Sequence, residues 1–396
     1  MRNKEIKNII ITDTHTRMAL AIIRELGQMG FNITSLSREG LSALGHKSRY
    51  ANNCITLPNK DYGEALLNLQ INDDFTILFP TGMYTLNTIA TRHKEFSEAY
   101  RGLFPTYEAL QKSADKPTVA RIARSLGLFV PEEYQLDNPC FPCVLKYRNG
   151  EALSLPASSR YAIVHSMEQY KQTLENMQNI ASSVASSIVS SANPEEANEI
   201  NNNTGEVFAS QYIPGNAYGV SAVLNKDSEP LAVFAHTRVR EYPLTGGPAS
   251  CAQSIWHLPL INAGLSLLKV LGVVGFAMVE FKGTLEQPYV LEVNPRIWGT
   301  YPLSRLCGAG MAIAYVNGAA ENASPLPNPL PDQCQYANEL RMQFLANDIS
   351  HFLASIPKGK LHLHVLSDMF SPHVKGGVFD KNDWPGNFVY LKNLFS

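Results

Sequence analysis

The stretch that decides the fold is Tyr289-Val290-Leu291-Glu292-Val293-Asn294-Pro295-Arg296. Its side chains alternate in character, so Glu292 and Asn294 share one face of a predicted strand while apolar residues occupy the other face. Pro295 ends the strand, and Arg296 follows it at once. A carboxylate, an amide and an arginine gathered at one strand end predict a polar functional site.

A second alternating segment, residues 273–282, precedes this strand, and a short connection between them predicts a hairpin. The hairpin would place Glu280 near Glu292 and Asn294. Oxygen ligands on adjacent strands suit Mg²⁺, and without a cation the two carboxylates would repel each other. The alternative is the solvated polar face of an amphipathic hairpin. The tight segment that follows, residues 298–301, argues against it because its aromatic residues and glycine are poorly suited to an exposed loop.

Two lysines lie upstream. Residues 113–117 supply a capping residue and a proline suited to the first helical position, so they predict a helix start that contains Lys116. An apolar strand expected at 141–147 carries Lys146 near its end. Burying a lysine is costly unless an anion meets it. The alternative for Lys146 is a side chain that emerges into solvent at the strand end.

A basic segment lies between these regions, at residues 237–242, and glycines follow it at 246–247. Alternation predicts that Arg238 and Arg240 share a strand face, and the glycines would let backbone amides approach an anion. The alternative is a basic strand edge and turn, which is favoured less for Arg240 than for Arg238. His236 is interpreted as an ordinary strand histidine unless it proves to lie in a cleft.

The N-terminal third alternates strands with helices, which predicts a parallel, doubly wound sheet. The first strand-to-helix turn, residues 12–16, contains no glycine that would let a pyrophosphate approach. The pattern therefore argues against a dinucleotide-binding domain. After about residue 310, four prolines form a connector, a helix is expected around residues 349–356 and a strand at 361–366.

Composition excludes several classes of protein. The 396 residues include 33 basic and 35 acidic side chains, a formal net charge of -2 that argues against a nucleic-acid or anionic-membrane surface. No run of about 18 apolar residues is present, and the apolar run after Lys7 is too short for a signal peptide. We therefore expect a cytoplasmic protein with reduced cysteines and no nucleic-acid or membrane partner.

Taken in order, these elements resemble the ATP-grasp superfamily from about residue 9 to residue 310. The resemblance is carried by Asp115-Lys116, Lys146, the stretch Ser210–Gly215, Glu280, and Glu292-x-Asn294-x-Arg296. It implies an α/β and α+β protein in which a Rossmann-like pre-ATP-grasp domain at residues 1–112 precedes a two-lobed ATP-grasp domain at residues 113–320. A polar, flexible insertion is expected at about residues 181–205, and a small C-terminal appendage at residues 321–396.

The resemblance also implies roles for individual residues. Lys116 and Lys146 would contact the phosphates of ATP. Backbone groups of Gln211, Tyr212 and Ile213 would hold the adenine, and Met278 would lie under its ring. Glu280, Glu292 and Asn294 would bind Mg²⁺, with Mn²⁺ as an alternative, and Arg296 and Arg240 are the catalytic candidates.

The implied reaction is the joining of a small, amino-acid-like carboxylate to an amine, through an acyl phosphate and with release of ADP and phosphate. Two alternatives stay open. The single glycine in the loop after Lys146, and Gln211 where relatives commonly carry an acidic residue, favour an ATP-binding regulatory or scaffold protein with weakened catalysis. A kinase-like phosphotransferase on the same fold is the other. Whether the chain forms a homodimer is open as well.

Overall fold

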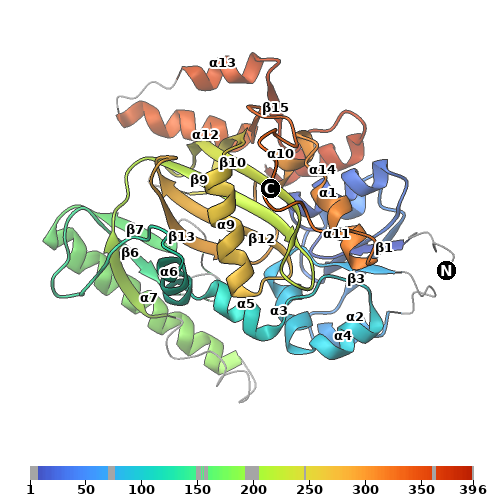
Figure 1. The fold of residues 1–396 in the computed structure, drawn as a ribbon, viewed down its shortest axis with the longest axis horizontal. Coiled ribbons are helices and arrows are strands. Elements are labelled where there is room, and N and C mark those ends of the chain that lie inside the picture. The colour runs from blue at the N-terminus through green and yellow to red at the C-terminus, as the bar shows by residue number, and fades with distance from the viewer. Residues whose placement is uncertain are drawn as a thin grey trace.

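The computed structural model describes residues 8–69, 76–148, 153, 155, 159–191, 205–244, 247–358 and 363–394. Its N-terminal domain, coloured blue to cyan in Figure 1, is built on a four-stranded sheet. The strand order is β3-β2-β1-β4. The strands are β1 (Asn8–Ile11), β2 (Asn32–Arg38), β3 (Asn53–Leu57) and β4 (Ile77–Phe79). All of these pairs are parallel, which confirms the predicted parallel sheet.

Helices cover both faces of this sheet because β1 alternates its isoleucines between two cores. Ile9 and Ile11 pack with helix α1 (Arg17–Gln28), whereas Ile10 packs with the opposite layer. That opposite layer comprises α2 (Tyr62–Leu67), α3 (Met83–Thr91) and α4 (His93–Ala99), whereas η1 (Leu44–Lys47) lies against α1. Thr16 caps α1, since its side chain accepts a hydrogen bond from the amide of Ala19.

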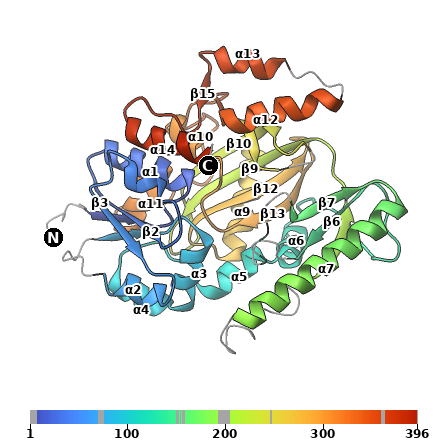
Figure 2. The same cartoon turned by 180° about the vertical axis from the view of Figure 1, so that it is seen from behind.

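A smaller lobe follows two linking helices, α5 (Tyr107–Ala114) and α6 (Lys116–Ser125). Its antiparallel sheet has the order β5-β8-β6-β7, from β5 (Glu133–Tyr134), β6 (Cys143–Tyr147), β7 (Tyr161–Val164) and β8 (Val207–Gln211). Helix α7 (Met167–Ser191) packs along this sheet, on the side of the molecule away from the N-terminal domain (Figure 2). The insertion expected at 181–205 therefore begins as helix as far as Ser191, and residues 192–204 lie outside the described residues.

The largest sheet has seven strands in the order β13-β12-β9-β10-β11-β14-β15. They are β9 (Asn216–Leu224), β10 (Pro230–Glu241), β11 (Ala249–Ile255), β12 (Gly275–Gly283), β13 (Pro288–Asn294), β14 (Arg341–Gln343) and β15 (Val374–Gly376). Helix α9 (Leu258–Leu271) packs on one face, and α10 (Tyr301–Leu306) and α11 (Met311–Ala319) pack on the other. The predicted hairpin of β12 and β13 is confirmed.

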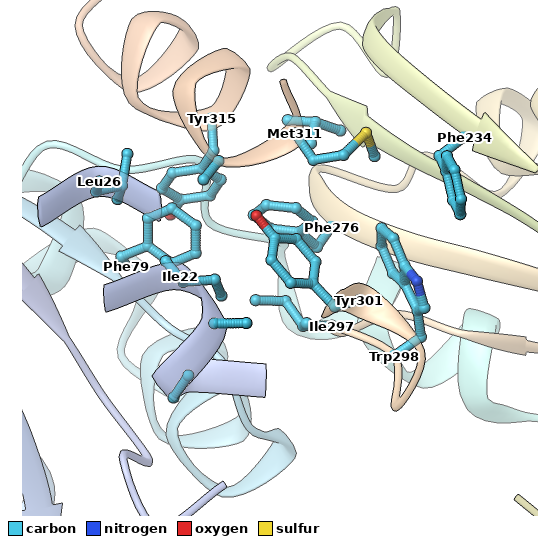
Figure 3. Close-up of a cluster of buried hydrophobic side chains, with 14 of the residues drawn as sticks. Ile22, Leu26, Phe79, Phe234, Phe276, Ile297, Trp298, Tyr301, Met311 and Tyr315 are labelled. Atoms are coloured by element: carbon cyan, nitrogen blue, oxygen red, sulfur yellow. The ribbon is translucent and has the colours of Figure 1, made fainter. Parts of the chain in front are cut away.

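An aromatic core joins the N-terminal domain to the large sheet (Figure 3). The ring centroid of Phe79 lies 5.4 Å from that of Phe276 and 4.3 Å from that of Tyr315. The Tyr315 hydroxyl accepts from the amide of Leu103 and donates to the carbonyl of Leu78, both at 3.1 Å. The two domains therefore share one core, and the N-terminal domain is fixed against the sheet that carries the site.

The C-terminal appendage is continuous with the large sheet, since β14 pairs with β11 and β15 pairs with β14. Its helices are α12 (Leu345–Ser355), η3 (Ile356–Lys358), α13 (His364–Phe370) and α14 (Trp384–Leu394). The strand expected at 361–366 is wrong where the structure describes it, because residues 364–370 are helical. The alternation of leucine and histidine imitates a strand, yet the buried side chains Val365 and Asp368 are spaced for a helix.

No helix among the described residues is long and apolar enough to cross a bilayer.

Candidate active site

One large cleft, with a volume of about 2030 Å³, is lined by residues from the N-terminal domain, the small lobe and the large sheet. It exceeds the roughly 300–1,000 Å³ of a pocket for one drug-sized ligand, so it has room for a nucleotide and further substrate. Ten predicted site residues line it, namely Lys116, Lys146, Gln211, Tyr212, Ile213, Met278, Glu280, Glu292, Asn294 and Arg296. Positions distant in the sequence are thus brought to one surface.

The carboxylates Glu280 and Glu292 face each other across the hairpin, because their Cα atoms are direct cross-strand partners. Asn294 donates from Nδ2 to both, at 3.2 Å to Glu280 and 3.4 Å to Glu292. Arg238 on β10 pairs with Glu280 at 2.5 Å. Burial, together with the neighbouring Glu292, raises the pKa of Glu280 despite this arginine.

Two lysines offset the second carboxylate. The Nζ of Lys116, at the start of α6, lies 3.1 Å from Oε2 of Glu292. Burial opposes ionisation of Glu292, but Lys116 and Lys146 outweigh it and lower its pKa to about 2. Burial, followed by the repulsion of Lys116, lowers the pKa of Lys146 to about 8. Acidic and basic groups thus share one half-buried cluster.

Arg296 lies at the end of β13, where its Nη2 donates to Oδ1 of Asn294 at 3.3 Å and its Nη1 donates to the carbonyl of Ile297 at 3.0 Å. The Asn294 amide therefore bridges the carboxylates and the arginine. A flip of the Asn294 amide would exchange Oδ1 and Nδ2 and point the oxygen toward the carboxylates. A cation bound between them needs that oxygen as a ligand.

The residues expected around the adenine line another part of the same cleft. Gln211 ends β8, and its Oε1 accepts from the amide of Glu132 at 3.3 Å, which fixes the side chain against the lobe. Ile213 and Met278 are buried. Gly219 leaves room for the Met278 thioether, since a Cβ at that position would stand 3.0 Å from the sulfur.

Arg240, for which the sequence predicts a catalytic role, does not line the cleft. It is buried outside the lining of the cleft, where its guanidinium bonds to Asp348 at 2.5 Å and to Asp368 at 2.6 Å. The reason is an irregularity in the pairing of β10 with β11 between Arg238 and Arg240. Such a bulge breaks the alternation from which a shared face was predicted, so Arg238 faces the cleft and Arg240 faces the appendage.

His236 is the second difference, because it lies in the cleft. Its ring is buried, Nε2 lies 3.1 Å from the Thr300 hydroxyl, and Nδ1 has no partner among the described residues. Burial, and secondly Arg238, lower the pKa of His236 to about 3, so the ring is neutral at physiological pH. Gly219 makes space for this ring too, since a Cβ there would stand 2.4 Å from Cε1.

Other residues that line the cleft were not among the predicted site residues. Arg148 bonds to Asp115 at 2.8 Å and to Glu206 at 3.1 Å. Arg17 comes from the start of α1, and Trp298 comes from the loop after β13. Trp298 and Arg148 lay in segments that the sequence singled out, the loop after β13 and the loop after Lys146, whereas Arg17 did not. The glycine loop after Lys146 lies mostly outside the described residues, as do Thr245 and Gly246.

Comparison with protein families gives one match. Residues 152–300 match the family model of the ATP-grasp domain. This segment contains β8, the hairpin and the loop after it, which supply most of the cluster described above. A search of curated proteins finds no match.

Solved structures resemble most of this fold. An L-amino acid ligase from Bacillus licheniformis superposes with a TM-score of 0.60 at 14% identity, over 85% of this chain and 80% of that one. A biotin carboxylase from Campylobacter jejuni, solved as a β-γ-ATP complex, gives 0.59 at 16% identity, over 85% and 74%. An N5-carboxyaminoimidazole synthetase from Staphylococcus aureus gives 0.52 at 14% identity, over 81% and 78%. The fold is therefore the two-lobed ATP-grasp fold that the sequence predicts.

Proposed function

We propose that this ATP-grasp protein is an ATP- and Mg²⁺-dependent ligase that joins a small, amino-acid-like carboxylate to an amine through an acyl phosphate. The observation that carries the proposal is the pairing of Glu280 with Glu292 across the hairpin, beside Lys116 and Lys146. Ligases among the structures of the same fold agree with it.

The donor set fits Mg²⁺. Two carboxylates and an amide oxygen are hard ligands, and Mg²⁺ usually takes a few of these and completes its shell with water and phosphate. Glu280, Glu292 and Asn294 would hold the ion, and Mn²⁺ accepts the same ligands. When bound, the cation offsets phosphate charge and orients the transferred group. The ion pairs that Glu280 and Glu292 make with Arg238 and Lys116 would give way in part to this cation.

The basic side chains of the cleft suit the binding of ATP and of the transferred phosphate. Phosphoryl transfer depends on positioning and on neutralisation of charge more than on covalent chemistry from the protein. Lys116 and Lys146 would bind the phosphates, Gln211, Tyr212, Ile213 and Met278 would surround the adenine, and the guanidinium of Arg296 would meet the transferred phosphate and the acyl oxygen. A planar arginine fork binds such oxygens in pairs.

The reaction then has two steps. A carboxylate oxygen of the first substrate attacks the γ-phosphorus of ATP, the bond to the β-γ bridging oxygen breaks, and ADP leaves. The amine of the second substrate attacks the acyl carbon, phosphate departs, and the amine loses a proton. Arg296 would stabilise the oxyanion that develops on the acyl oxygen, and the neutral ring of His236 lies in the same cleft.

The direct test is a screen of amino acids and other small acids with amines, read by ADP and phosphate release. We expect release that requires both an acid and an amine. AMP and pyrophosphate as products contradict the proposal. ADP formation without an amine indicates the phosphotransferase, and ATP binding without turnover across the panel indicates the regulatory protein.

A further inference from the structure

Arg17 brings a positive charge from the N-terminal domain into the cleft. It is the first residue of α1 and lines the same cleft as Arg296. Its Nη2 lies 3.5 Å from the position that a Cβ on Gly299 would occupy, so the loop after β13 passes directly beside the guanidinium. Arg17 thus adjoins the segment that carries the proposed reaction centre.

The charge of Arg17 has no carboxylate partner among the described residues. Its guanidinium carbon lies 3.6 Å from the centre of the Phe344 ring, and the hydroxyl of Tyr390 lies near enough to favour the charged form. Arg24 and Arg240, by contrast, both pair with buried aspartates. Burial lowers the pKa of Arg17, as expected for a cation without an anion.

The residues that flank Gly299 on this loop carry no negative charge. The Nε1 of Trp298 is buried and lacks an acceptor among the described residues. The Thr300 hydroxyl lies beside neutral His236. Removing the Arg17 guanidinium from water costs free energy, which an anion bound in the cleft would recover. The two parallel N–H groups of a guanidinium match the two oxygens of a carboxylate.

We propose that Arg17 is a specificity-determining residue that binds a substrate carboxylate other than the one that ATP phosphorylates. The assignment rests on the proposed function. In the proposed function, the two lysines and the cation already offset the charge of the nucleotide phosphates. Arg296 adjoins the cation site through Asn294 and is assigned to the transferred phosphate. A single guanidinium against the apolar ring of Phe344 suits a carboxylate, which carries one negative charge. The carboxylate belongs either to the amine substrate or to a donor acid with two carboxyl groups.

The test compares matched pairs of ligands on the full-length protein with Mg²⁺ and a non-hydrolysable ATP analogue. The probes are L-alanine against L-alaninamide, and succinate against its monoamide, with binding measured by calorimetry. We expect the acid of at least one pair to bind at least about tenfold more tightly than its amide, and Arg17→Met to abolish that preference. A preference within the alanine pair assigns the carboxylate to the amine substrate, and one within the succinate pair assigns it to the donor acid.

Control variants separate ligand binding by Arg17 from a structural role in holding the C-terminal appendage. Tyr390→Phe removes the hydroxyl that Arg17 contacts but keeps the guanidinium, so it should retain the preference. Arg17→Lys should retain part of it, and serves if Arg17→Met does not fold. Affinity for the ATP analogue should change less than about twofold in every variant. Equal binding of acid and amide by the wild type, no binding of any probe, or an unchanged preference in Arg17→Met overturns the assignment. If the wild type shows no ligase turnover, the proposed function is contradicted instead, and the binding result can still be interpreted.

Discussion

The ε-amino group of Lys146 lies among charges of both signs. Burial and Lys116 oppose its protonation, whereas Glu292 and Glu280 favour it, and the balance lowers the pKa of Lys146 to about 8. A phosphate contact requires the protonated form. The group is therefore charged at neutral pH but titrates close above it.

This titration predicts a pH dependence. In the free enzyme, kcat/KM for ATP should fall as the pH rises through about 8, because Lys146 loses the proton that a phosphate needs. Lys146→Arg should remove the fall, since an arginine stays protonated. The measurement is a pH profile of kcat/KM for ATP with both variants. An alkaline limb that Lys146→Arg leaves unchanged contradicts the assignment.

The metal assignment predicts a second outcome at the same scale. Glu292→Ala and Asn294→Ala should each reduce turnover by about a hundredfold or more while the protein stays folded, because each removes a ligand of the cation. Glu286→Gln, on the exposed hairpin connection, is the matched control and should keep wild-type activity. Turnover is measured against Mg²⁺ concentration, with circular dichroism to confirm folding. Near-normal activity at limiting Mg²⁺ in either alanine variant means that the assignment is wrong.

At the scale of the elements, the irregularity in β10 determines which arginine serves the cleft. Arg238 and Arg240 differ by two positions and would share a face in a regular strand. The shift in pairing instead directs Arg240 to Asp348 on α12 and Asp368 on α13. The appendage is thereby tied to the large sheet by a buried ionic cluster.

Breaking this cluster should affect stability more than catalysis. Arg240→Met leaves the buried Asp348 without its ion-pair partner and leaves Asp368 with Arg341 alone, so we expect a loss of about 3–5 kcal/mol in the free energy of unfolding. Arg92→Met, which breaks exposed pairs with Glu64 and Glu95, should cost far less, because water solvates these charges in the folded protein. Urea unfolding measures both. A loss of turnover in folded Arg240→Met as large as that of Glu292→Ala would restore the catalytic interpretation.

The sequence predicts the elements whose signals are local. The hairpin could be predicted because alternation and a short connection fix its register. Both lysines could be predicted because they lie at positions marked by a helix start or a strand end. The prediction that Arg238 and Arg240 share a face was wrong because one irregular pairing reverses the faces. Arg17 was missed because no local pattern marks a cation whose surroundings come from Gly299, Phe344 and Tyr390.

At the scale of the whole molecule, the shared aromatic core holds the N-terminal domain against the large sheet (Figure 3). Phe79 belongs to the first sheet, Phe276 to the large sheet and Tyr315 to α11, yet their rings are in contact. The cleft therefore has walls from both domains that are fixed relative to each other. Arg17 depends on this arrangement to reach the loop after β13.

The core should dominate the stability of the whole chain. Phe79→Ala removes a fully buried ring and should lower the free energy of unfolding by about 3–5 kcal/mol. Phe388→Ala, at a side chain that is 70% exposed, should change it by about 0.5 kcal/mol or less. Chemical denaturation compares the two. Equal effects mean that the two domains do not share one core.

The most direct test of the central claim follows an oxygen atom. An acid substrate found in the screen is labelled with ¹⁸O in its carboxylate and incubated with ATP, Mg²⁺ and the amine. An acyl phosphate transfers one carboxylate oxygen to the phosphate that leaves, so we predict inorganic phosphate with one ¹⁸O atom for each amide formed. Unlabelled phosphate, or ¹⁸O recovered in AMP, contradicts the account.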